Sequence, residues 1–181
     1  MTFKETFSND EKQLLTTLPN LIGTAVAFSE SSGILGTMKE MFASGKTVIG
    51  GVKTYPNNSI ISGVLPSLED RNEAWQKSKE LRVALQDKLK TQNITSKEQF
   101  NTMLLSDCKK VNELLKQKSS HEEASEYKKW ALNVAEVVAK SSKEGGFLGF
   151  GGTRISDGEK HLIGEISNHL ETPNPLMPKT S

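Results

Sequence analysis

Two histidines and a glutamate near the C-terminus have the types and spacing of metal ligands. His161, Glu165 and His169 follow one another at intervals of four, which places them along one face of a helix. Imidazole nitrogens and carboxylate oxygens are ordinary zinc ligands. The helical rise separates His161 from His169 by about 12 Å, however, so the three side chains cannot hold one ion. We therefore expect a solvated polar face and assign no metal to it.

The sequence offers no recognisable catalytic nucleophile. Its single cysteine, Cys108, falls on an apolar helical stripe and has no activating neighbour beyond the two lysines that follow it, which predicts a buried and inert thiol. No Gly-x-Ser-x-Gly elbow and no Cys-x-x-Cys pair occurs in the sequence. The acids Glu122 and Glu123 suit the first turn of a helix, where negative charge is favourable. We assign no catalytic residue and expect no cofactor.

The run 145–152 combines five glycines with three large apolar residues between two helical segments. It is not a nucleotide loop, because a helix precedes it and no Gly-Lys-Ser/Thr ending follows. We favour the interpretation that the apolar side chains plug the end of a helical bundle. Two alternatives are an exposed apolar contact for a protein or membrane, and an anion site made by glycine N–H groups and Arg154. The contact-loop candidates are therefore Phe147, Leu148, Phe150 and Arg154.

The segment 144–160, which contains this run and the helix start that follows it, resembles the C-terminal signature of a family of small all-helical bacterial proteins without an assigned activity. The stretch 10–19, with Asp-Glu-Lys, Leu-Leu and a proline, is similar to the opening of the same proteins. The resemblance covers most of the chain and implies a bacterial all-α protein. A shorter stretch, 152–159, is similar to the tellurite-resistance TerB-like helical family, which implies a stress-related role. Because Gly151 and Gly152 replace the acidic turn of that family, no metal site is carried over.

The balance of charge argues against a nucleic-acid-binding protein. The chain has 23 basic and 22 acidic side chains, a net charge of +1, and no strongly basic region. The longest uncharged stretch near its beginning, 13–29, is too short and too polar for a transmembrane helix, and the first residues lack the apolar core of a signal peptide. A single cysteine fits a reducing compartment. We expect a cytoplasmic protein with a protein partner or self-association, and membrane association as the weaker alternative.

Helix starts are the strongest local pattern in the chain. Five hydroxyl residues are each followed three positions later by an acid, as in a capping box, where the hydroxyl accepts an orphan backbone N–H and the acid bonds back to the cap. The acids also favour the positive end of the helix dipole. The pairs are Ser8/Glu11, Ser67/Asp70, Thr95/Glu98, Ser120/Glu123 and Ser156/Glu159.

Apolar residues recur at helical spacing after these starts. They predict helices over about 68–91, 96–118 and 121–143, and a last helix after residue 156. In the first of these, we expect Leu81, Leu85 and Leu89 to face inward, with Trp75 on the same side. In the last, the predicted inward residues are Leu162, Ile166 and Leu170.

The first third of the chain predicts a helix over 11–28, kinked or divided at Pro19, and a second helix that ends near residue 54. Its many small residues predict close packing of this hairpin inside the bundle. The prolines that follow Glu171 predict a disordered tail.

Together these patterns predict one all-α domain over residues 1–170, with 171–181 as a proline-rich tail. We expect an antiparallel bundle of six or seven helices without significant sheet. Three function classes stay open. The favoured one is a non-enzymatic cytoplasmic bacterial protein that acts through protein contacts. The others are a peripheral membrane-associating protein and an enzyme or metal-binding bundle whose site the sequence does not reveal.

Overall fold

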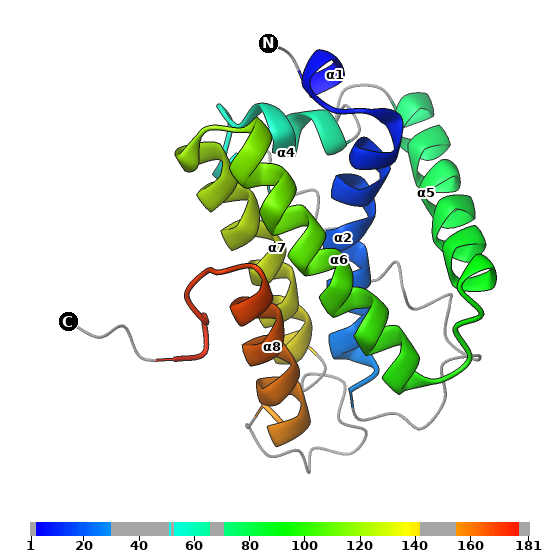
Figure 1. Ribbon diagram of the computed structural model, residues 1–181, viewed down its shortest axis with the longest axis vertical. Helices are drawn as coiled ribbons and strands as arrows, with labels where there is room; N and C mark the ends of the chain where they lie inside the picture. The colour runs from blue at the N-terminus through cyan, green and yellow to red at the C-terminus, as the bar shows by residue number, and fades with distance from the viewer. Residues whose placement is uncertain (1–2, 30–50, 52, 66–70, 142–154, 178–181) are drawn as a thin grey trace.

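The computed structural model describes residues 3–29, 51, 53–65, 71–141 and 155–177 (Figure 1). Within these ranges the chain forms seven α-helices and no strand, which confirms the predicted all-α class. The helices are α1 (Phe3–Thr6), α2 (Asn9–Ala27), α4 (Ser59–Val64), α5 (Arg71–Thr91), α6 (Lys97–Lys118), α7 (His121–Ser141) and α8 (Asp157–His169).

Helix α2 is the centre of the bundle. It contacts α7 and α6 most extensively, and also α5, α8 and α4. Figure 1 shows α7 and α8 on one side of it and α5 on the other. Residues 17–26 of α2 are all buried, as expected for a helix enclosed by others. The first helix of the predicted N-terminal hairpin thus lies in the interior, whereas residues 30–50 lie outside the described residues.

Two of the predicted capping boxes form as the sequence indicates. Ser8 accepts the backbone N–H of Glu11, and the glutamate carboxylate accepts the backbone N–H of Ser8 at 2.8 Å. Ser156 and Glu159 repeat this arrangement at the start of α8. Local hydrogen bonds therefore define the first residues of α2 and of α8. The predicted start at residue 67 lies outside the described residues.

The start of α6 differs from the prediction by one residue. Ser96 rather than Thr95 is the cap, and Gln99 rather than Glu98 completes the box. The amide oxygen of Gln99 accepts the backbone N–H groups of both Thr95 and Ser96, at 2.8 and 3.1 Å. Glutamine and glutamate are equivalent at this position of a capping box, and the search for an acid alone missed the correct pair.

Pro19 lies inside α2, which runs unbroken, so the division that the sequence allowed there does not occur. Proline has no N–H, and the carbonyl of Leu15, four residues earlier, loses its helical partner. The buried hydroxyl of Tyr127 in α7 donates to that carbonyl at 2.6 Å. A distant side chain thus supplies the donor that Pro19 removes, and the same bond ties α7 to α2 in the core.

The predicted inward stripes of α6, α7 and α8 form the core. The buried members are Phe100, Leu104, Cys108, Val111, Leu115, Tyr127, Ala131, Val134, Leu162, Ile166 and Leu170. On α5, Leu85 is buried and Leu81 and Leu89 pack partly buried against the same core. Trp75 is 63% exposed and not on that side. At about 100° per residue, Trp75 lies roughly 80° around the helix from the buried Leu85, so it falls at the edge of the apolar face rather than on it.

Residues 171–177 of the predicted tail form turns after α8. Glu171 adopts a left-handed φ of 49°, and the N–H of Thr172 donates to the carbonyl of Ser167 at 3.1 Å. The hydroxyl of Ser167 donates back to the Thr172 carbonyl, and Leu176 packs against the core. Residues 178–181 lie outside the described residues, and the division of the chain into a domain and a tail stays a prediction.

Candidate functional site

The contact-loop candidates from the sequence are Phe147, Leu148, Phe150 and Arg154, and all of them lie outside the described residues. The described chain resumes at Ile155, which packs partly buried against the core just before the cap of α8. Whether the loop plugs the bundle, contacts a partner or binds an anion therefore stays a prediction.

The contacts described for the histidine-containing face of α8 are local. His161 Nε2 lies 3.5 Å from Glu165 Oε2, and its side chain is largely exposed. His169 Nδ1 lies 2.9 Å from the carbonyl oxygen of Glu165 and is turned toward its own helix. Among the described residues, no group of three His, Cys, Asp or Glu side chains is placed to hold a metal ion.

Cys108 is fully buried, as its place on an apolar stripe predicts. Burial, reinforced by the neighbouring carboxylate of Asp107, raises the pKa of the thiol well above its ordinary value. Cys108 therefore stays protonated at neutral pH, and the thiolate that a nucleophile requires does not form.

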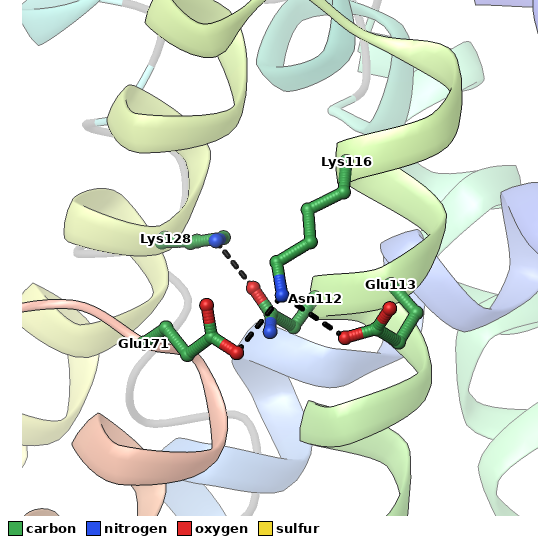
Figure 2. Close-up of polar contacts among 5 residues, drawn as sticks. All are labelled: Asn112, Glu113, Lys116, Lys128 and Glu171. Carbon is green, nitrogen blue, oxygen red and sulfur yellow. Dashed lines mark hydrogen bonds and ion pairs between the residues drawn. The ribbon is translucent and has the colours of Figure 1, made fainter.

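A buried lysine forms part of a polar cluster that the sequence did not indicate. We call it the Lys128 cluster; its members are Asn112, Glu113 and Lys116 of α6, Lys128 of α7 and Glu171 after α8 (Figure 2). Lys128 is only 8% exposed, and its ammonium donates to Asn112 Oδ1. Lys116 Nζ lies 3.1 Å from Glu113 Oε1 and 2.9 Å from Glu171 Oε1. The cluster therefore joins three segments that are distant in the sequence.

Burial lowers the pKa of Lys128, and the carboxylates of Glu171 and Glu113 oppose this effect only in part. Lys116 and its two carboxylate partners are exposed, so each ion pair contributes little to stability. An amine with a lowered pKa can serve as a nucleophile or base. Lys128 lines neither of the two cavities described below, however. The arrangement suits a fastening of residues 171–177 onto α6 and α7 better than it suits catalysis.

The N-terminus of α4 is docked on α7 by Asn58, whose side chain is fully buried. Its Oδ1 accepts two backbone N–H groups of α4, and its Nδ2 donates to the Glu123 carbonyl and to Glu126 Oε2. The Ser59 hydroxyl donates to Glu123 Oε1 at 2.6 Å, and Ser120 donates to the other carboxylate oxygen. These bonds lower the pKa of Glu123, with Ser59 as the main cause. Every hydrogen-bonding position of the Asn58 amide is used, which indicates a structural junction.

Among the residues that the structure describes, two open cavities lie at the surface of the bundle. One, of about 470 Å³, lies beside Asp107, whose buried carboxylate pairs with Lys88 and lies 3.7 Å from the ammonium of Lys110. The other, of about 430 Å³, lies between Tyr55, Trp130 and the turns after α8. The carboxylate of Asp107 beside the first cavity is engaged by two lysines, and Trp130 beside the second belongs to the core. Neither of these two side chains therefore offers a reactive group to its cavity.

The outward face of α5 presents large apolar side chains to solvent. Trp75 is 63% exposed and Val83 is 47% exposed. We define the α5 stripe as the exposed residues Trp75, Lys79, Arg82, Val83 and Lys90, whose spacing of four, seven, eight and fifteen from the first places them on one face. The ammonium of Lys79 lies 5.7 Å from the centre of the Trp75 ring, a cation–π arrangement. The main helix contact of α5 is made with α2, and its core residues Leu81, Leu85 and Leu89 lie on the side of the helix next to the stripe.

Comparison of the chain with models of known protein families finds no match, and neither curated proteins nor solved structures match it. The similarity to small bacterial helical proteins and to the TerB-like family therefore stays a prediction, together with the stress-related role it implies. In the described part of the chain, no helix combines the length and the apolar character needed to cross a membrane. Of the residues that the structure describes, those of the α5 stripe form a candidate contact site, whereas the Lys128 cluster suits a structural role.

Proposed function

We propose that this chain is a non-enzymatic helical-bundle protein that acts through contact with another protein, and that the α5 stripe is its contact surface. The observation that carries the proposal is the exposure of Trp75. An indole ring offers up to roughly 250 Å² of surface for burial, and tryptophan is enriched among the residues that dominate binding energy at protein interfaces. The exposed Val83 adds a second apolar contact about two helical turns away.

The burial of the reactive side chains supports contact over catalysis. Cys108 and Lys128 are both enclosed by the bundle, whereas the α5 stripe lies on a helix at its edge (Figure 1). Interface centres are enriched in aromatic side chains, which Trp75 supplies, and Lys79 beside its ring suits the polar rim. A cytoplasmic location in a bacterial cell, expected from the sequence, belongs to the same proposal.

Photo-crosslinking from the stripe tests this function. The photoreactive residue p-benzoylphenylalanine replaces Trp75 in one variant, and Glu122, which is exposed on α7, in a matched control. In the cells that make the protein, we expect a discrete protein adduct from position 75 and none of the same mass from position 122. Equal adducts from both positions, or none from position 75, would contradict the proposal.

A further inference from the structure

The charges around Trp75 indicate what kind of surface the partner presents. The α5 stripe contains three exposed cations, Lys79, Arg82 and Lys90, and no acid. Of the acids of α5 whose exposure the structure describes, Glu80 and Asp87 lie three residues before and four after Val83, on the flank of the helix away from Trp75. The electrostatic character of the stripe is therefore basic on the side of Trp75, although the whole chain is nearly neutral.

We infer that the α5 stripe binds an acidic protein surface, one that offers carboxylates to its cations and an apolar contact to Trp75 and Val83. This inference rests on the proposed function and adds the chemistry of the partner. Complementary charge accelerates encounter and excludes partners that bring like charge. The ammonium of Lys79 already lies against the indole ring, so a partner carboxylate that binds it would be held beside Trp75.

A second copy of the chain does not fit the α5 stripe. A two-fold dimer would place the same patch on both subunits, so Lys79 and Arg82 of one copy would approach those of the other. Like charges in such contact disfavour association. A two-fold dimer through the stripe is therefore disfavoured, and a different, acidic protein is the occupant that we infer.

An anionic membrane fits the α5 stripe less well than a protein does. A helix that lies in a membrane interface needs a continuous apolar face. The two apolar residues of the stripe are about 12 Å apart along the helix axis, with the cation of Lys79 between them. This arrangement suits two separate apolar contacts within a polar interface.

Synthetic probes test the inference directly. Two amphipathic helical peptides share one apolar sequence and carry either glutamates or lysines, and phosphatidylglycerol vesicles form a third probe. Because Trp130 is buried, acrylamide quenching of the intact protein reports mainly on Trp75, and Trp75→Phe is the control for that assignment. We expect the acidic peptide alone to protect Trp75 from quenching, and protection to weaken at high salt.

Charge reversal sharpens this test. Lys79→Glu combined with Arg82→Glu should weaken binding of the acidic peptide by about tenfold or more. The control, Lys109→Glu combined with Lys129→Glu, changes exposed positions of α6 and α7 and should leave that binding unchanged. Equal protection by both peptides, protection by vesicles alone, or no protection by any probe would overturn the acidic-partner inference. If a crosslinked partner is nevertheless obtained from position 75, the proposed function stands and only the acidic character of the partner is wrong.

Discussion

At the residue scale, the hydroxyl of Tyr127 completes a hydrogen bond that Pro19 removes from α2. Tyr127→Phe should leave the Leu15 carbonyl buried without a donor and lower the free energy of unfolding by about 1–3 kcal/mol. Pro19→Ala restores a backbone N–H opposite that carbonyl. In the Pro19→Ala background, Tyr127→Phe should therefore lower the free energy of unfolding distinctly less. Urea unfolding of the four proteins of this double-mutant cycle gives the answer, and equal costs in both backgrounds would refute the explanation.

Alanine at Gly51 and alanine at Gly164 should change the stability of the fold in opposite directions. A Cβ at Gly51 would lie 2.2 Å from Nε1 of the buried Trp130, too close for any real contact. Gly51→Ala should destabilise the fold by about 1–3 kcal/mol, the range for overpacking. A Cβ at Gly164, inside α8, would meet only Asn174 Nδ2 at 3.6 Å, so Gly164→Ala should stabilise by up to about 1 kcal/mol. A higher melting temperature for Gly51→Ala than for Gly164→Ala would contradict the packing described around these two glycines.

The buried ammonium of Lys128 should produce a pH dependence of its own. Because burial lowers its pKa, the folded state binds this proton less tightly than the unfolded state does. The cost of the buried charge is therefore full at neutral pH and is relieved as pH rises from the lowered pKa toward about 10.4, the value in the unfolded chain. Wild type should thus gain stability relative to Lys128→Met between pH 7 and pH 10. Lys129→Met, at the exposed next position, is the control, and an identical trend in both variants would contradict the burial of Lys128.

At the element scale, the carboxylate of Glu123 joins the starts of α4 and α7. Its pKa is lowered, so its contribution to stability is present above about pH 4.3 and is lost as pH falls through the lowered pKa. Glu123→Gln should cost about 1–2 kcal/mol at pH 7, because a charged hydrogen-bond acceptor is lost, and the cost should shrink below pH 4. Ser59→Ala removes the main cause of the shift and should show the same trend in urea unfolding. A difference from wild type that is constant with pH would rule out this role.

The helices could be predicted from sequence wherever their signals are local. Capping by Ser8 and Ser156 involves residues three positions apart, and the stripes of α6 and α8 follow from helical periodicity. The cap of α6 was placed one residue early because glutamine, as well as glutamate, can complete the box. Trp75 was misplaced because an apolar residue was assumed to face inward, and this misplacement concealed the α5 stripe.

The Lys128 cluster could not be predicted, because its members come from α6, α7 and the turns after α8. Helical spacing places Lys128 beside the buried Ala124 and Ala135 and places Lys129 on the opposite side of α7. The sequence therefore indicates which lysine is buried, but not the partners that other segments bring to it. The bond from Tyr127 to Leu15 was hidden for the same reason, although Pro19 already implied an unpaired carbonyl somewhere in α2.

At the scale of the whole molecule, a buried helix, α2, is enclosed by amphipathic helices, and α5 stands at the edge with an exposed tryptophan (Figure 1). Because the core and the α5 stripe are separate parts of the bundle, the core variants described above do not alter the contact surface directly. Tyr127→Phe and Gly164→Ala should change the stability of the fold, and should leave binding through the α5 stripe unaltered at temperatures where the protein is folded.

The central claim is that the α5 stripe binds another protein, and the most direct measurement is the affinity of the purified, crosslinked partner for two variants of the chain. Trp75→Ser combined with Val83→Ser removes the apolar part of the stripe without touching the core. We expect the dissociation constant to rise by about tenfold or more, the loss of one interface hot spot, while a Glu122→Ser control binds as wild type. An unchanged dissociation constant for the double variant would contradict the account.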